Sequence, residues 1–303
     1  MPVQERHIKG WDHEMVPQPA DPKPQPKDPD LPRNFCASLW VGPKKSGKTQ
    51  TCIKLLKRFE TSGVYLKGRR VSQRIILLSP TVHQNRAWSV LKYLDPDRDV
   101  FTDYTDAMLA DVISDIEREK RESLEYQRRL AVWKKAARAP KSLTQEEYAE
   151  LELMHWEPPE KPRFPDGPAV NHVVCDDMIG TSIFKQGRNP FTQFVALSRH
   201  LLCNVYVLIQ HLKGCNTLIR HNSDLYAIWK FGNLKMALED IYPVVSGACT
   251  PEEFAELYTH ATGPDHSCLV YDSTQPKERR FKQNFDKVLS VVPSNEQARP
   301  VAT

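Results

Sequence analysis

The sequence has 303 residues, enough for one large domain or two small ones. Its 42 basic and 38 acidic side chains give a formal charge of +4, too small an excess to indicate a nucleic-acid-binding protein by itself. The seven cysteines are odd in number and mostly lie in apolar stretches, which indicates reduced thiols of an intracellular compartment and not a disulfide framework. With no signal peptide and no apolar run of about 18 residues, we expect a soluble protein that does not span a membrane.

The two ends of the chain differ from its middle. Residues 1–33 contain eight of the 24 prolines, with scattered charge and few apolar side chains. This composition predicts a disordered or polyproline arm outside the fold. We expect residues 34–290 to form the folded domain and residues 291–303 a flexible tail.

From residue 35 onward, short apolar runs alternate with stretches of helical period. Buried strands are expected at 35–41, 74–79, 169–175, 204–209, 224–231 and 267–271. Before the last of these, Thr250, Pro251 and Glu253 are placed as the N-cap, the first helical residue and the capping-box acid of a helix. The alternation predicts an α/β fold with a mainly parallel sheet flanked by helices.

A long charged segment separates the second expected strand from the third. About 90 residues lie between them, far more than one crossover connection needs. Residues 107–155 have a helical period and are expected to form a charged helical insertion. Within it, residues 128–141 include six basic side chains and no acidic one, which fits either a solvated helix face or a stripe that contacts phosphates.

The most informative motif follows the first expected strand. The sequence GPKKSGKT matches the phosphate-binding loop G-x-x-x-x-G-K-T. In such a loop the backbone N–H groups surround the phosphates of a nucleotide, and the following helix N-terminus adds its partial positive charge. Lys48 is expected to reach the β- and γ-phosphates, and the Thr49 hydroxyl to ligate Mg²⁺. The residues expected to bind the nucleotide are Gly42, Pro43, Lys44, Lys45, Ser46, Gly47, Lys48 and Thr49.

Polar residues at the ends of two later strands predict the rest of the site. The run HVVCDD places Asp176 and Asp177 at the carboxyl end of a strand, where an open parallel sheet binds its ligand. Asp176 is expected to hold Mg²⁺, and Asp177 to orient and polarise an attacking water. Gln210 ends the run NVYVLI, where its amide could contact both the γ-phosphate and that water. Solvated strand-end or turn residues are the alternative interpretation of Asp177 and Gln210.

A zinc site is a weaker alternative elsewhere in the chain. The spacing of His200, Cys203, His211 and Cys215 faintly resembles that of zinc ligands. The strand expected between the two pairs would hold them about 20 Å apart, which argues against a shared metal.

The runs GPKKSGKT, RIILLSPT, HVVCDDMIG, LSRHLLCNVYVLIQ, LIRHNSDLYAIWKF and FKQNFDK together resemble a known family. They are similar to the genome-packaging ATPases of large double-stranded DNA viruses, in the poxvirus-type branch of the FtsK–HerA superfamily of RecA-like P-loop NTPases. The resemblance covers roughly residues 35–290, and the double Asp and the segment 198–231 are its most specific parts.

The resemblance implies a ring-forming motor that uses ATP and Mg²⁺ to drive double-stranded DNA into a capsid. A homo-oligomeric ring of five or six subunits, partners at a capsid vertex or among membrane-associated assembly proteins, and a location in the virion and the host-cell cytoplasm are implied with it. On this model Lys48 and Thr49 bind phosphate and metal, Asp176 and Asp177 are the metal-binding and catalytic acids, and Gln210 is the phosphate sensor.

Ring motors also supply an arginine from a neighbouring subunit to the γ-phosphate. Arg188, Arg199 and Arg220 are the candidates. Arg199 is preferred as a catalytic residue because it closes a helix expected at 191–200, just before the sensor strand.

Three other functions stay open. A ring helicase or other DNA translocase of the same superfamily would act outside any capsid. A P-loop kinase would place its acid-tipped strand differently and carry an arginine-rich lid, and a non-catalytic nucleotide-dependent scaffold is disfavoured because every catalytic position is filled.

Overall fold

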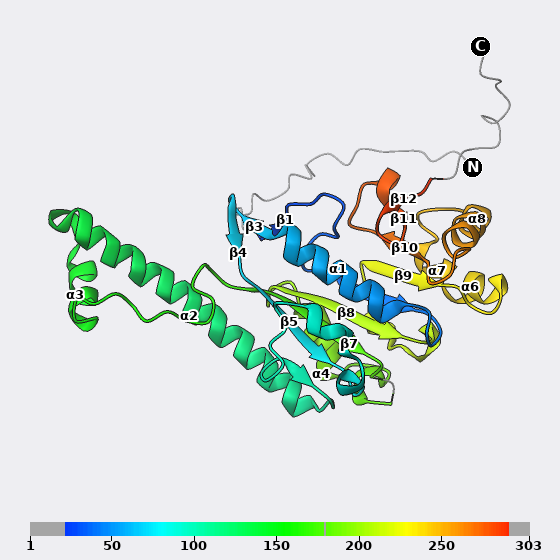
Figure 1. The fold of residues 1–303 in the computed structure, drawn as a ribbon, viewed down its shortest axis with the longest axis horizontal. Helices are drawn as coiled ribbons and strands as arrows, with labels where there is room; N and C mark the ends of the chain where they lie inside the picture. The colour runs from blue at the N-terminus through cyan, green and yellow to red at the C-terminus, as the bar shows by residue number, and fades with distance from the viewer. Residues whose placement is uncertain (1–21, 179, 291–303) are drawn as a thin grey trace, which may run out of the picture.

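A computed structural model describes residues 22–178 and 180–290. Its centre is a nine-stranded sheet with the strand order β12-β11-β10-β9-β2-β8-β7-β5-β6, and a separate sheet has the order β1-β3-β4 (Figure 1). The strands are β1 (Gln25–Pro26), β2 (Ala37–Val41), β3 (Val64–Leu66), β4 (Arg69–Val71), β5 (Gln73–Leu78), β6 (Val100–Phe101), β7 (Val170–Asp176), β8 (Cys203–Ile209), β9 (Leu225–Trp229), β10 (Cys268–Asp272), β11 (Phe281–Gln283) and β12 (Lys287–Val288).

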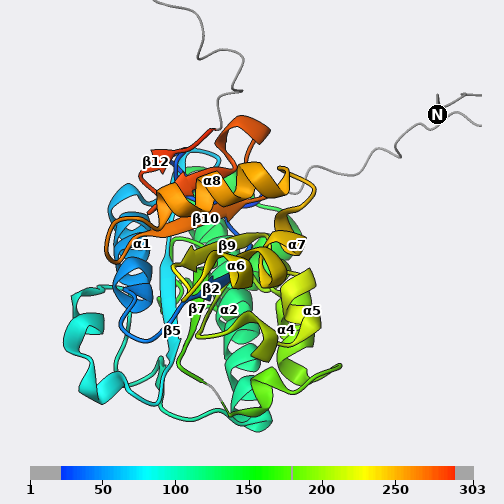
Figure 2. The ribbon, with the colours of Figure 1, turned by 90° about the vertical axis from the view of Figure 1, so that its right-hand side faces the viewer.

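Helices cover both faces of the large sheet, as Figure 2 shows with α1 on one side and α4 and α5 on the other. The α-helices are α1 (Lys48–Ser62), α2 (Asp106–Arg138), α3 (Gln145–Leu153), α4 (Pro190–Leu197), α5 (Thr217–His221), α6 (Leu234–Asp240), α7 (Tyr242–Val245) and α8 (Pro251–Ala261). Within the described part of the chain, no helix combines the length and the apolar character required to cross a lipid bilayer.

The sheet has a parallel centre and an antiparallel edge. Strands β6, β5, β7, β8, β2 and β9 run parallel to one another. The predicted α/β fold with a mainly parallel, helix-flanked sheet is therefore confirmed, and all six expected strands lie within two residues of their predicted bounds. The sixth of them, β10, runs antiparallel to β9. The connection through α6, α7 and α8 leaves the carboxyl end of β9 and enters β10 beside that same end. The Thr250 capping box of α8 is present.

Each face of the sheet has its own apolar core. On the α1 face Trp40 stacks against Trp229 with ring centroids 5.9 Å apart, and Phe59 of α1 is buried in the same cluster. On the other face, Phe191 of α4 and Phe254 of α8 are fully buried. Burial of large apolar side chains on both faces fixes the parallel strands in register and thereby fixes the edge at which they end.

The expectation that residues 1–33 stand outside the fold is wrong for the part that the structure describes. Gln25 and Pro26 form β1, which pairs with β3, and Leu31 is only 2% exposed. Asp28 accepts a hydrogen bond of 2.7 Å from Nε of Arg58 in α1. This proline-rich segment is held by the buried side chains of Pro24, Leu31 and Pro32, by the pairing of β1 with β3 and by a few polar contacts, and composition does not reveal them. Residues 1–21 and the tail expected at 291–303 lie outside the described residues.

A buried ion-pair network joins α2 to the sheet. Arg74 of β5 contacts Asp99 at 2.6 Å and Glu119 of α2 at 2.8 Å, and Arg163 contacts Asp99 at 2.7 Å. Arg74, Asp99 and Glu119 are each no more than 6% exposed. Buried charges of this kind are tolerated only when they are paired, so the loss of one partner would leave an uncompensated charge in the interior.

The segment 107–155 forms most of α2 and all of α3. The N-terminal half of α2 packs on the sheet through Leu109, Val112 and Ile116, and its C-terminal half projects with α3 as a helical arm (Figure 1). Much of its basic stretch is neutralised within the arm. Arg128 contacts Glu150 of α3 at 2.5 Å, and Lys135 contacts Glu147 of α3 at 2.7 Å. Arg129 contacts Glu125 in the preceding turn of α2 at 2.5 Å. These pairs favour the interpretation of a solvated, internally paired helix surface.

Candidate functional site

The loop from Gly42 to Thr49 leaves the end of β2 and enters α1. The backbone N–H of Gly42 donates to the carbonyl of Ile209 at 3.2 Å, which ties the start of the loop to the end of β8. A Cβ atom at Gly42 would lie only 2.6 Å from Cβ of Trp229, so a side chain here would displace the core. Gly47 has φ of +101°, a left-handed conformation that favours glycine. The two glycines of the motif are thus required by the geometry of the turn.

Lys48 and Ser46 present polar groups at the centre of this loop. The Lys48 ammonium donates to the carbonyls of Gly42 at 2.7 Å and Pro43 at 2.9 Å. Burial lowers the pKa of Lys48, and the carboxylates of Asp176 and Asp177 oppose this shift. Among the described residues, the buried Oγ of Ser46 has no hydrogen-bond partner. An unsatisfied buried hydroxyl beside a half-buried ammonium fits a loop built to receive an anion.

Thr49 and Asp176 meet where α1 begins and β7 ends. The Thr49 hydroxyl donates to Oδ2 of Asp176 at 3.0 Å, and Asp176 is 6% exposed. Burial raises the pKa of Asp176, while the hydrogen bond from Thr49 and the charge of Lys48 oppose the rise. A hydroxyl and a carboxylate held together at a phosphate-binding loop are the oxygen ligands that Mg²⁺ prefers. The donor set therefore fits that ion.

Asp177 and Gln210 lie at the same edge of the sheet. The Gln210 amide donates from Nε2 to Oδ1 of Asp177 at 3.1 Å. Asp177 has φ of +57°, which is rare for a residue other than glycine, and turns the chain at once after β7. The structure thus brings together the predicted residues Lys48, Thr49, Asp176, Asp177 and Gln210.

A cavity of about 490 Å³ opens in front of the loop. Loop and α1 residues form most of its wall, namely Lys45, Ser46, Gly47, Lys48, Thr49, Gln50, Thr51 and Lys54. The wall also includes Asn85, from the loop after β5, and His266, from the loop before β10. Sequence reasoning missed both, because neither belongs to a motif and only the strand order brings them here. Pro43 and Lys44 of the loop are exposed and lie outside this wall.

The three candidate arginines lie away from this cavity. Arg199 is exposed and lies beyond the end of α4 at Leu197, so the helix expected at 191–200 stops earlier. Arg199 precedes β8 and Gln210 follows it, so the two residues lie at opposite ends of this strand. Arg188 is exposed in the loop before α4.

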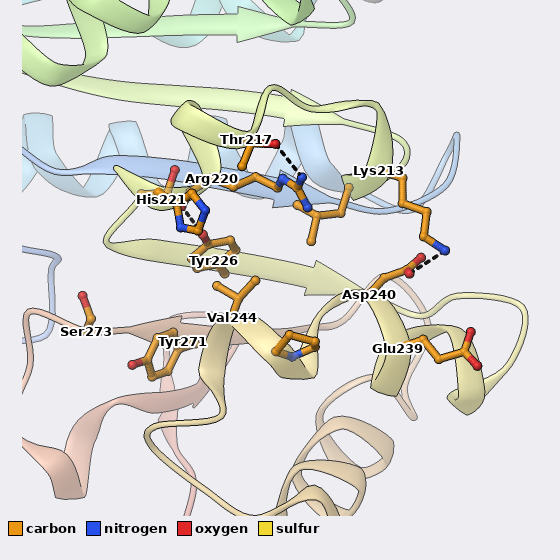
Figure 3. A pocket seen from close by; sticks show the side chains of 13 residues that line it. Lys213, Thr217, Arg220, His221, Tyr226, Glu239, Asp240, Val244, Tyr271 and Ser273 are labelled. Atoms are coloured by element: carbon orange, nitrogen blue, oxygen red, sulfur yellow. Dashed lines mark hydrogen bonds and ion pairs between the residues drawn. The ribbon is translucent and has the colours of Figure 1, made fainter. Parts of the chain in front are cut away.

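Arg220 lines a different cavity, of about 470 Å³, against α5, α6 and α7. Figure 3 shows its guanidinium directed toward Thr217, whose hydroxyl lies 3.0 Å from Nη2. Lys213 and Asp240, which form an ion pair of 2.9 Å, also line this cavity. Within its own chain, none of the three arginines lines the cavity in front of the phosphate loop.

The four residues weighed as zinc ligands are divided by β8. Cys203 begins the strand and His211 follows its end, so the two pairs lie at opposite ends of β8. No cluster of three or more metal-ligating side chains occurs within residues 22–178 and 180–290. All seven cysteines are free thiols.

The strand order, the loop and the two acids together define an α/β fold of the P-loop NTPase type. No protein-family model and no curated protein matches the sequence. Among solved structures, the chain is similar to the genome-packaging NTPase B204 from Sulfolobus turreted icosahedral virus 2 in complex with sulfate. That similarity has 14% identity over 82% of this chain and 95% of the other, with a TM-score of 0.45.

Two further structures overlap with the chain. The same NTPase in complex with ATP-gammaS matches at 14% identity over 84% of this chain and 98% of the other, with a TM-score of 0.43. EccC (ATPases 2 and 3) of Thermomonospora curvata matches at 15% identity over 66% of this chain and 31% of the other, with a TM-score of 0.34. TM-scores below 0.5 at such identities assign no function to this chain, which has to be argued from its own residues.

Proposed function

We propose that this protein is an ATP-driven double-stranded DNA translocase that packages a viral genome into a capsid. The observation that carries the ATPase part is the position of β8 between the loop strand β2 and the acid strand β7. This order brings the phosphate loop, the acid pair and Gln210 to one edge of the sheet. The part that concerns DNA and the capsid is supported by the resemblance of the sequence to the packaging ATPases.

The residues have distinct roles in this proposal. The loop Gly42–Thr49 binds the phosphates of ATP through its backbone N–H groups and the Lys48 ammonium. Thr49 and Asp176 hold Mg²⁺, which supplies charge neutralisation on the phosphates when it is bound. Asp177 accepts a hydrogen bond from the attacking water and orients it toward the γ-phosphate.

Gln210 links that step to movement of the protein. Its amide contacts Asp177 at 3.1 Å, and the residue before it, Ile209, accepts a hydrogen bond from the backbone N–H of Gly42 at the start of the phosphate loop. Loss of the γ-phosphate would change the partners of this amide at the tip of β8. Arg199 would complete the site of a neighbouring subunit in a homo-oligomeric ring of five or six copies, working with a capsid vertex or membrane-associated assembly proteins in the virion and the host-cell cytoplasm.

The test compares Mg²⁺-dependent ATP hydrolysis by the parent, Lys48→Ala and Lys92→Ala, with and without duplex DNA. We expect duplex DNA to stimulate the parent, Lys48→Ala to lose turnover and bind ATP more weakly, and Lys92→Ala to behave like the parent. Lys92 is the matched control because its exposed side chain lies outside the phosphate loop and outside the cavity wall. Turnover in Lys48→Ala near the parent rate would contradict the assignment of the loop.

Two further measurements separate the competing functions. A packaging motor tracks a duplex without opening it, so displacement of a strand from a forked duplex would instead indicate a ring helicase. A rate of ATP turnover that does not change when DNA is added, together with phosphate transfer to a small acceptor, would indicate a kinase. The kinase interpretation already conflicts with the separation of the acid strand β7 from β2 by β8.

A further inference from the structure

A second cavity, of about 370 Å³, adjoins the cavity in front of the phosphate loop. The two share three wall residues, Thr51, Lys54 and His266. They therefore lie next to each other along α1, with the first at the N-terminus of that helix. A ligand held by its phosphates at the loop has the second cavity beside it.

One wall of the second cavity is a stripe of α1. Thr51, Lys54, Leu55 and Arg58 line it at intervals of three and four residues, which places them on one face of the helix. The Arg58 guanidinium is already held by Asp28 at 2.7 Å and by the carbonyl of Phe285 at 3.4 Å. This wall is therefore fixed by one contact outside the cavity, to Asp28, and by one to the opposite wall, at Phe285.

The opposite wall is built from two loops at the antiparallel edge of the sheet. Asn284 joins them, since its Oδ1 accepts from the backbone N–H of Cys268 at 2.9 Å and its Nδ2 donates to Oγ of Ser267 at 3.1 Å. The carbonyl of His266 accepts from Nε1 of Trp229 at 3.2 Å. Phe285 is buried and stacks on Trp40 with centroids 5.3 Å apart. The wall is thus preorganised by its own hydrogen bonds and by the core.

The two cavities differ in chemistry. The first offers ammonium groups and backbone N–H groups, which suit phosphates. The second shares Lys54 with the first and includes Arg58, which Asp28 already pairs, and it adds the exposed carboxylates of Asp265 and Asp286, which accept hydrogen bonds. The exposed imidazole of His266 stands at the junction, in a residue held at φ of +60°. Hydrogen-bond acceptors and an aromatic ring suit a nucleoside, whose sugar carries hydroxyl donors and whose planar base carries amino donors.

We propose that the second cavity binds the nucleoside half of the nucleotide. His266 lies against the nucleoside where it joins the phosphates, and the carboxylates of Asp265 and Asp286 accept hydrogen bonds from its hydroxyl and amino groups. This inference rests on the proposed function, because it presumes that the loop holds the triphosphate. It adds that the β10–β11 edge of the sheet recognises the nucleoside.

The test measures binding by calorimetry with two probes, Mg²⁺·ATP and Mg²⁺·tripolyphosphate, and reports the ratio of their affinities. This ratio cancels the general effect of a charge change on phosphate binding. The parent should bind ATP at least about tenfold more tightly than tripolyphosphate. His266→Ala and Asp286→Ala should each reduce the ratio several-fold, and Lys287→Ala, an exposed change next in the chain that is outside the cavity wall, should not.

The outcomes are distinguishable. A parent that binds both probes equally, or variants that keep the parent ratio, would overturn the inference and leave the phosphate loop intact. A parent that binds neither probe would overturn the proposed function and the inference with it. His266 and Asp286 are exposed, so their truncation leaves the core in place.

Discussion

The amide of Gln210 donates a hydrogen bond of 3.1 Å to the carboxylate of Asp177, joining the tips of two adjacent parallel strands. Asp177 is thereby held in one orientation, although its backbone has the unusual φ of +57°. A carboxylate whose position is fixed by a neighbouring amide is suited to orient a water molecule and poorly suited to serve as a solvated surface acid.

The first prediction concerns Asp177→Asn. This change keeps the shape of the side chain and removes the charge that polarises water. We expect normal binding of Mg²⁺·ATP and a loss of several powers of ten in turnover, because the interaction is used only in the transition state. Steady-state kinetics measures the turnover and calorimetry the binding. A higher Michaelis constant with intact turnover would assign Asp177 a structural role.

The second prediction concerns Arg199. Arg199 lies at the start of β8 and Gln210 lies beyond its end, so Arg199 cannot reach the nucleotide site of its own subunit. Lys48→Ala and Arg199→Ala proteins should each be inactive alone, whereas a mixture should recover ATPase activity wherever an intact site meets an intact neighbouring arginine. Arg188→Ala serves as the control and should stay active. The absence of recovery at every ratio, with rings shown to form, would remove Arg199 from the site.

The third prediction concerns the basic stretch of α2. Arg128, Arg129 and Lys135 each pair with a carboxylate, and Lys135 holds the pKa of Glu147 below its ordinary value. A cation already paired with a carboxylate neutralises no DNA phosphate and therefore releases no counterion from the duplex, so replacing all three with Gln should leave the salt dependence of duplex binding unchanged.

The same triple variant should instead loosen α3 from α2, seen as faster amide exchange across residues 145–153. Arg118→Gln is the matched control, because Arg118 pairs with Asp115 and Glu122 inside α2 and not with α3. A flatter salt dependence with unchanged amide exchange would show that the stretch contacts DNA.

The fourth prediction concerns His172, which is buried in β7. Its Nδ1 lies 3.0 Å from the hydroxyl of Tyr206 and its Nε2 lies 3.1 Å from Oε1 of Gln73. Burial lowers the pKa of His172 from 6.5 to about 3. Below pH 6.5 the unfolded chain therefore binds a proton that the native protein does not bind, and the free energy of unfolding falls as the pH is lowered.

His172→Gln keeps hydrogen-bonding capacity and removes this titration. Well below pH 6.5, the parent should lose roughly 1.4 kcal/mol of unfolding free energy relative to the variant for each unit by which the pH is lowered. Denaturant titrations at several pH values measure it. The raised pKa of Asp176 acts in both proteins and cancels. Parallel pH profiles would contradict a neutral buried histidine.

Local patterns were sufficient to predict the parallel centre of the fold. Apolar runs bounded by polar residues located β2, β5, β7, β8 and β9, and the polar residues that end three of them converge at one edge because parallel strands end together. The same patterns carry no information on strand direction after a multi-helix excursion, so the antiparallel β10 was not foreseen.

Other features depend on contacts between distant segments. His266 and Asn85 reach the cavity only through the strand order, and the N-terminal segment is held by the burial of Leu31. The six basic residues of 128–141 looked unopposed because the acids that neutralise several of them belong to a different helix, α3. Sequence separation hid each of these relationships.

The buried ion pairs of Arg74 anchor the arm to the sheet at Glu119. Beyond Glu119, α2 continues to Arg138, a length of about 28 Å at roughly 1.5 Å per residue. A rotation of about 7° at this anchor would displace the far end of α2 by about 3.4 Å. Arg74 belongs to β5 and is in register with Asn171 at the start of the acid strand β7, so the rest of β7 connects the anchor of the arm to Asp176 and Asp177 at the other end of that strand.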